Sequence, residues 1–245
     1  MQSILRPFLI LSAAFVAPAV VALDIASTDI AGLRAGMSVE EAEAALRRHA
    51  ADFTITRHEI TYGYSDGAVQ YETPPILSRV MAKRLYYPGV AGTQDNFLLV
   101  FFGLPGEEVL TAMHRSVSGL RNPATRADFL KSLVAKYGEP HVAFAGNQYA
   151  TWLADPRRPE VCFTMQNGVS EISSPLMETS QRQTFDDCAS MVRYSVGSDP
   201  VTGFYAELID LEGIIATHEA VQAWIDGLEE DAVRKREANA ELPSL

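Results

Sequence analysis

The chain has 245 residues, a net charge of −11 at pH 7 and a hydrophobic fraction of 47%. This hydrophobic fraction excludes an intrinsically disordered protein, and the length allows one large domain or two small ones. The acidic balance argues against nucleic acids and anionic membrane surfaces as partners, because both attract basic patches. An acidic surface also keeps any protein in solution, so the charge alone identifies no partner.

Residues 1–22 have the pattern of a secretory signal peptide. Arg6 is followed by the apolar run Phe8–Ala17, and small residues then offer cleavage after Ala19 or, as we favour, after Ala22. Pro18 interrupts the apolar run, which is too short for a membrane-spanning helix. We therefore expect an exported protein, periplasmic or secreted, that has no membrane anchor once the signal peptide is cleaved.

The chain contains two cysteines, Cys162 and Cys188. In the oxidising compartment that export implies, an even number of cysteines predicts a disulfide bond, worth roughly 3–4 kcal/mol from the entropy of the closed loop. A metal or redox pair is the alternative, but it would need further ligands or a C-x-x-C spacing.

The first folded segment, residues 23–118, is expected to be a helix followed by an antiparallel sheet. Ser38 and Glu41 form a capping box, and Ala42, Ala45 and Leu46 share one face of a helix over 38–49. A helix this short is unstable alone and must lie on other structure. The four strands expected next are FTITRHEITYGY, VMAKRLYYPG, NFLLVFFG and EVLTAMHRSVSG, of which NFLLVFFG is apolar on both faces and is predicted to be central.

The segment 119–211 repeats this pattern. GLRNPATRADFLKSLVAKYGEP aligns with GLRAGMSVEEAEAALRRH without a gap, so that Thr125 and Asp128 correspond to Ser38 and Glu41. Gly138 is expected to end the second helix. The strands predicted after it are HVAFA, YATWLAD, EVCFTMQ, SMVRYSV and GFYAELID. These features predict tandem helix-plus-sheet repeats, and chance similarity between two capped helices is the alternative.

Residues 212–245 are predicted to form a long C-terminal helix with a frayed tail. Its apolar stripe consists of Ile214, His218, Val221, Ile225, Leu228 and Ala232, with a spacing close to that of a coiled coil. The stripe either docks on the protein's own sheet or pairs with a second copy or a partner helix.

Motifs for catalysis, metal binding and cofactors are missing from the sequence. Its histidines, which have no metal-ligand spacing, are His49, His58, His114, His141 and His218. A nucleophile elbow, a P-loop and a dinucleotide fingerprint are all absent. We therefore predict no catalytic residues, no metal and no cofactor.

Two groups of residues are candidates for binding. Tyr62, Tyr64, Tyr86 and Tyr87 would give an aromatic face, since tyrosine is enriched at interfaces, although tyrosines on an ordinary exposed strand give the same pattern. Arg157 and Arg158 stand in a proline-bounded loop, DPRRPE, that either binds an anion or forms a solvated hairpin turn.

The segment GLRAGMSVEEAEAAL resembles the helix start of the SmpA/OmlA (BamE-like) family of small outer-membrane lipoproteins. It is also similar to the tandem-repeat fold of the beta-lactamase inhibitor protein. The resemblance covers about 20 residues at each repeat start, but this chain lacks the family's lipid-carrying cysteine and adds a long C-terminal helix. It implies a binding module in the envelope of a Gram-negative bacterium.

Together these features predict an exported α+β protein that binds another envelope protein without catalysis. A periplasmic hydrolase with no recognisable motif, and a structural protein that self-associates through its C-terminal helix, are the alternatives.

Overall fold

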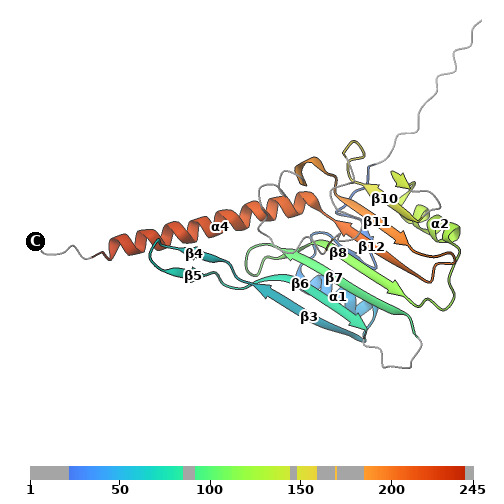
Figure 1. Ribbon diagram of the computed structural model, residues 1–245, viewed down its shortest axis with the longest axis horizontal. Coiled ribbons are helices and arrows are strands. Elements are labelled where there is room, and N and C mark those ends of the chain that lie inside the picture. Colours follow the sequence, from blue (N-terminus) through green and yellow to red (C-terminus); the bar gives the residue numbers. More distant parts are fainter. Residues whose placement is uncertain (1–21, 85–91, 144–147, 159–168, 170–184, 241–245) are drawn as a thin grey trace, which may run out of the picture.

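One eight-stranded antiparallel sheet organises the computed structural model (Figure 1), which describes residues 22–84, 92–143, 148–158, 169 and 185–240. The strand order is β3-β6-β7-β8-β12-β11-β10-β9. Helix α1 (Val39–His49) precedes β3 (Phe53–Ile60), β6 (Ile76–Arg84), β7 (Gln94–Phe102) and β8 (Val109–Ser118). Helix α2 (Arg126–Tyr137) precedes β9 (Val142–Ala143), β10 (Tyr149–Leu153), β11 (Met191–Val196) and β12 (Gly203–Ile209). The predicted α+β class is thus confirmed.

Both short helices begin where their caps predict. The Ser38 hydroxyl accepts a hydrogen bond from the Glu41 backbone N–H, and the Glu41 carboxylate accepts one from the Ser38 N–H, which completes the capping box of α1. The Thr125 hydroxyl accepts from the Asp128 N–H at the start of α2. Gly138 ends α2 with a φ of 80°, a left-handed value that favours glycine.

A small N-terminal hairpin, which the sequence did not lead us to expect, ties these helices to the sheet. It pairs β1 (Asp29–Ile30) with β2 (Leu33–Arg34) through a two-residue turn. On α2, the Tyr137 hydroxyl donates to the Asp29 carbonyl at 2.7 Å, and Lys136 Nζ binds the Asp29 carboxylate at 3.0 Å. The hairpin therefore packs on the same face of the sheet as the helices.

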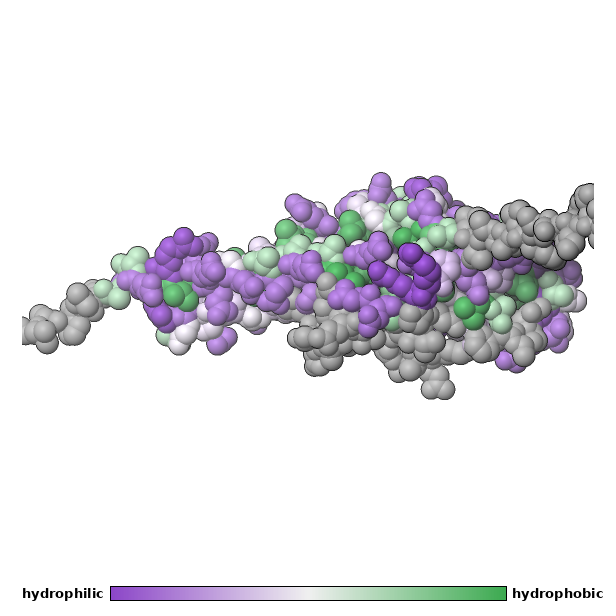
Figure 2. Space-filling view, turned by 90° about the horizontal axis from the view of Figure 1, so that it is seen from above, coloured by the Kyte–Doolittle hydropathy of each residue, from purple (hydrophilic) through white to green (hydrophobic). Residues whose placement is uncertain are grey.

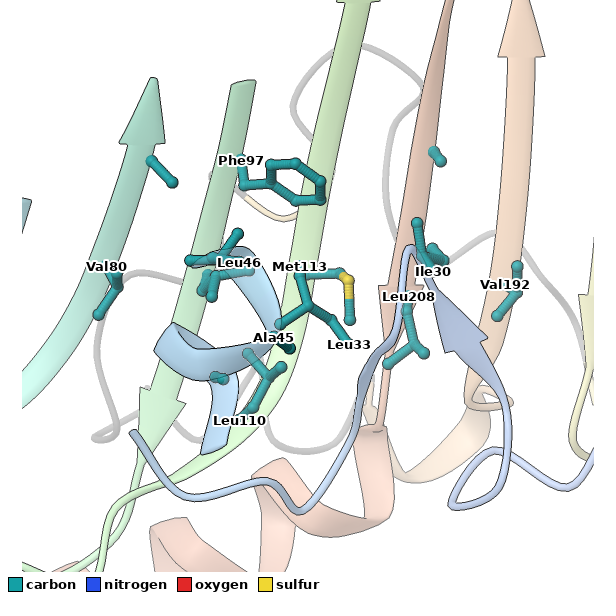
Figure 3. Close-up of a cluster of buried hydrophobic side chains, with 14 of the residues drawn as sticks. Ile30, Leu33, Ala45, Leu46, Val80, Phe97, Leu110, Met113, Val192 and Leu208 are labelled. Atoms are coloured by element: carbon teal, nitrogen blue, oxygen red, sulfur yellow. The ribbon is translucent and has the colours of Figure 1, made fainter. Parts of the chain in front are cut away.

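The larger core lies between these elements and one face of the sheet (Figure 3). Ala45 and Leu46 of α1 contact this core, and Ile30 and Leu33 bring in the N-terminal hairpin. The sheet contributes side chains from seven strands, and among these side chains are Val80, Phe97, Leu110, Met113, Val192 and Leu208. Burial of the apolar face of α1 in this core stabilises the helix, which is too short to be stable alone.

A second core lies on the opposite face, at the end of the sheet from which α4 (Leu211–Ala238) leaves. Val100, Ala112 and Ile209 lie in this cluster with Leu211 and Ile214 of the first turn of α4. The predicted C-terminal helix is confirmed, and the start of its apolar stripe docks on the protein's own sheet.

The remainder of α4 projects beyond the sheet and forms an arm with a second hairpin (Figure 1). That hairpin pairs β4 (Gly63–Ser65) with β5 (Gln70–Glu72). Val221 and Ile225 of α4 form a third cluster with Ile76, against which Tyr62 and Tyr64 pack. Figure 2 shows the narrow arm covered mainly by hydrophilic residues, with a small hydrophobic patch near its end. We call the β4–β5 hairpin and residues 226–240 the arm.

Two strand predictions need correction. The strand expected from Phe53 to Tyr64 ends at Ile60, because the chain there leaves the main sheet for the arm hairpin. The segment predicted to be central, β7, is an interior strand between β6 and β8, whereas the middle of the sheet lies between β8 and β12. Apolar residues on both faces therefore identified an interior strand without locating the centre.

Other predictions fall outside the described residues. These are the signal peptide through residue 21, the strand EVCFTMQ and the last five residues of the tail. Of the strand HVAFA, only Val142–Ala143 is described as β9. In the part of the chain that is described, no helix is both long enough and apolar enough to cross a membrane.

Candidate functional site

A row of charged side chains crosses the face of the sheet opposite to α1 and α2. His114 on β8 lies directly opposite Glu207 on β12, which in turn lies opposite Arg193 on β11. His114 Nδ1 lies 3.3 Å from Glu207 Oε1, and Arg193 Nε donates to Glu207 Oε2 at 2.9 Å. Glu207 and Arg193 are only 8% and 9% exposed. Such a pair is stable only because each charge has its partner.

The surroundings of Glu207 keep it ionised. Burial alone would raise the pKa of this carboxyl, but the hydrogen bond from His114 and the positive charge of Arg193 outweigh it, so the pKa lies below its usual value. Glu207 is therefore a fixed anion that orients His114 and Arg193.

An exposed tyrosine stands beside this row. Tyr205, two residues before Glu207 on β12, is 54% exposed, and its ring lies 5.5 Å from the ring of His114. Leu98 on β7 is partly buried and lies opposite His114, and Met81 on β6 lies opposite Leu98. We call the surface formed by Met81, Leu98, His114 and Tyr205 the Tyr205 face.

A second cluster of the same composition lies on the helix side of the sheet. Asp95 accepts two hydrogen bonds from Arg115, at 2.9 and 2.7 Å, and lies 2.9 Å from His49 Nε2 at the end of α1. The Arg115 guanidinium also lies over the rings of Phe97 and Phe204. This cluster anchors α1 to the sheet, which is a structural role.

The arm contains a cavity of about 720 Å³ between its hairpin and α4. The rings of Tyr64 and Tyr71 stack 5.3 Å apart on the hairpin side. Across the gap, Arg236 donates a hydrogen bond to the Asp66 carbonyl. The residues that line the cavity are Tyr64, Asp66, Tyr71, Leu228, Asp231, Ala232, Lys235, Arg236, Glu237, Asn239 and Ala240. None of these residues belongs to the Tyr205 face.

The structure describes only two of the four tyrosines that the sequence grouped as an aromatic face, so that grouping stays a prediction. Tyr64 lies on β4 in the arm and Tyr62 lies just before that strand, and both pack against the cluster that contains Val221 and Ile225. Tyr86 and Tyr87 lie outside the described residues. The exposed aromatic residue of the sheet is instead Tyr205, which sequence reasoning missed because alternation within β12 does not indicate which face is covered.

The predicted anion site is occupied by the protein's own carboxylate. Arg157 makes two hydrogen bonds to Asp155, at 2.9 and 3.0 Å, and the Arg158 guanidinium lies 3.7 Å from the same carboxylate. These bonds from Arg157 lower the pKa of Asp155 to about 2. The arrangement fits the alternative interpretation of a solvated turn.

Cys188 is buried, and no described cysteine is a free thiol. Cys162 lies outside the described residues, so the Cys162–Cys188 bond stays a prediction.

The remaining histidines do not form a site with one another. His141 Nδ1 accepts a hydrogen bond from the Leu153 N–H at 2.7 Å, which helps to hold the edge of the sheet. Among the described residues, no group of three or more histidine, cysteine or acidic side chains is arranged to hold a metal ion.

The sequence indicated neither histidine–carboxylate pair. His49 and Asp95 are 46 residues apart, and His114 and Glu207 are 93 apart. Only the sheet register brings them together, so a search for closely spaced ligands could not find them.

Comparison with known proteins found no matching family model, no matching curated protein and no matching solved structure.

Proposed function

We propose that this protein is a non-catalytic protein-binding module whose contact surface is the Tyr205 face. The observation that carries the proposal is the 54% exposure of Tyr205, whose ring lies against His114 above the buried Arg193–Glu207 pair. A large aromatic side chain that does not pack into the core, yet is held from below, is a typical anchor of a protein interface.

The neighbouring residues support the same interpretation. Met81 and Leu98 add partly buried apolar surface on the same face of the sheet, on the far side of His114 from Tyr205, and the His114 ring fixes the tyrosine on one side. A rigid mixed surface of this kind loses little conformational entropy on binding. The expected partner is another protein of the cell envelope, in line with the signal peptide predicted for residues 1–22.

The alternative of a periplasmic hydrolase would have to use the His114–Glu207 pair as its acid–base group. General acid–base catalysis needs a cavity in which a substrate reaches the imidazole. The cavity in the arm is not lined by His114. Glu207 is held by Arg193 as a fixed counter-charge, which favours binding over catalysis at this pair.

We also infer that the chain is built as a tandem repeat. Each half of the sheet consists of a helix followed by four strands, and the halves join through β8 and β12. This order agrees with the alignment of Gly119–Arg121 on Gly32–Arg34 and with the resemblance to tandem-repeat binding proteins.

A photo-crosslinking amino acid at position 205 tests the proposal in envelope extract. It is expected to capture one discrete partner, whereas the same probe at Val69, which is 50% exposed on the arm, should not capture that partner. Tyr205→Ala should then abolish pull-down of that partner, while Val69→Ala leaves it unchanged. Equal capture from both positions, or pull-down that survives Tyr205→Ala, would contradict the proposal.

A further inference from the structure

The outer half of α4 leaves apolar surface uncovered along the stripe that holds its inner half. The four residues of α4 that are buried, Leu211, Ile214, Val221 and Ile225, all precede residue 226. Leu228 and Ala232 continue the same stripe but remain half-exposed and line the 720 Å³ arm cavity. The helix extends about 20 Å beyond Ile225, at about 1.5 Å per residue.

Exposed hydrophobic residues are concentrated on the same arm. The described residues include three exposed large hydrophobic side chains, and two of them, Val69 (50%) and Tyr71 (37%), belong to the hairpin segment. Tyr71 also lines the cavity together with Leu228 and Ala232. The arm therefore offers a groove with both apolar and charged residues, bounded by the hairpin on one side and by the helix on the other, and bridged where Arg236 donates to the Asp66 carbonyl.

The charges that flank the groove identify an occupant, because they run from acidic to basic along the helix. Residues 229–231 are Glu-Glu-Asp, and residues 234–236 are Arg-Lys-Arg. With about 3.6 residues per turn, Glu229 and Arg236 lie on one flank of the stripe centred on Ala232, and Asp231 and Lys235 lie on the other.

This arrangement is complementary to itself. When two copies of α4 cross in antiparallel orientation about a two-fold axis at Ala232, the same flank of each helix meets. Glu229 then faces the partner's Arg236, and Asp231 faces the partner's Lys235, so every flank pairs opposite charges. A parallel pairing in register would instead align like charges at the same level.

We infer that the arm is a dimerisation device, in which the outer halves of α4 from two copies of this chain pack against each other along the stripe of Leu228 and Ala232. In the dimer, the pair of Arg236 with the partner's Glu229 replaces its hydrogen bond to the Asp66 carbonyl. The inference does not depend on the proposed function, because the arm and the Tyr205 face share no residue. The dimer would present two Tyr205 faces, so a multivalent partner would be bound with avidity.

Charge reversal with sedimentation equilibrium tests the inference on the full chain. We expect the wild-type protein to dimerise. Glu229→Lys with Asp231→Lys (variant A) should raise the dimer dissociation constant by about tenfold or more, because all four pairs become repulsive. Lys235→Glu with Arg236→Glu (variant B) should do the same. An equimolar mixture of A and B should restore the dimer, since every flank again pairs opposite charges.

The matched control is Asp226→Lys with Glu230→Lys, which changes the net charge as variant A does but lies on the opposite face of α4. It should leave the dimer unchanged. A wild-type protein that stays monomeric up to its solubility limit would overturn the inference, as would a dimer insensitive to variant A or a mixture that stays monomeric.

A cysteine crosslink keeps the test independent of whether the charge variants fold. Ala232→Cys lies on the proposed two-fold axis and should give an oxidised dimer on a non-reducing gel, whereas Glu230→Cys should not. Equal crosslinking at both positions would reject the specific antiparallel arrangement.

Discussion

At the residue scale, β8 carries two adjacent side chains that serve opposite faces of the sheet. His114 points to the Tyr205 face and pairs with Glu207, while Arg115 points to the helix side and pairs with Asp95. Each carboxylate binds one histidine and one arginine. The two clusters differ in what covers them. Helix α1 packs over the Asp95 cluster, whereas the Glu207 cluster lies beside the Tyr205 face.

The buried pair of Glu207 and Arg193 should be sensitive to the loss of either partner. Glu207→Gln leaves the guanidinium of Arg193 buried without its counter-charge, so the free energy of unfolding should fall by about 3–5 kcal/mol. Urea unfolding at pH 7 measures the change. Glu43→Gln is the control, because its partner Arg57 is 51% exposed and can turn to water, so that the loss of the pair should cost less than about 1 kcal/mol. Equal losses for both variants would mean that Arg193 finds another partner.

Acid should destabilise the fold through the two buried carboxylates. Burial alone would raise the pKa of both Asp95 and Glu207, but the arginine and histidine partners lower them below 3.8 and 4.5. The folded state thus binds fewer protons than the unfolded state near these values. The stability that this difference provides is complete above about pH 5 and is lost as the pH falls through the folded values.

Urea midpoints measured from about pH 6 down to pH 3 test this expectation. Asp95→Asn should make the acid-side fall in stability shallower than in the wild type. Asp52→Asn, which alters an exposed pair with Arg84, should not change that slope. An unchanged slope for Asp95→Asn would show that the carboxylates of these clusters do not control acid stability.

These residue-level features mark a limit of what the sequence could predict. The capping box of Ser38 and Glu41 was predictable, because its partners are three residues apart and the geometry is local. The pairing of Glu207 with Arg193 and His114 was not, because it depends on the register of three strands.

At the element scale, the junction between β8 and β12 joins the two halves of the sheet. Gly203 begins β12 opposite Ser118, where a Cβ atom would lie 2.5 Å from the Val117 carbonyl oxygen. The two backbones approach so closely there that only glycine fits.

Gly203→Ala is therefore expected to lower the free energy of unfolding by about 1–3 kcal/mol, because one of the paired strands must shift. Gly197→Ala is the control, since no atom lies within 4 Å of the Cβ position there. Thermal unfolding followed by circular dichroism compares the two variants. A loss no larger for Gly203→Ala than for Gly197→Ala would mean that the junction is not tightly packed.

The elements themselves were more predictable than their arrangement. Alternation and turn residues predicted most of the described strands, and the apolar stripe predicted α4. The hairpin β4–β5 was missed, because it is stabilised by contacts with α4 such as that between Asp66 and Arg236, 170 residues apart. The pairing of β8 with β12 is likewise a long-range contact without a local signal.

At the scale of the whole molecule, α4 divides into an inner part that completes the cores and an outer part that does not. Leu211 and Ile214 close the second core, and Val221 and Ile225 close the third. A chain that ends at Gly227 keeps all four, so its urea midpoint should stay near that of the full chain while its helical circular dichroism decreases. A chain that ends at Asp210 loses all four, each worth about 1.5–3 kcal/mol, and should unfold far more readily.

Sedimentation of the chain ending at Gly227 should give a monomer, since the self-complementary charges of residues 229–236 are gone. If that chain unfolded as readily as the one ending at Asp210, the arm would be part of the folding core, and its exposed groove would be explained by stability instead of by a second copy.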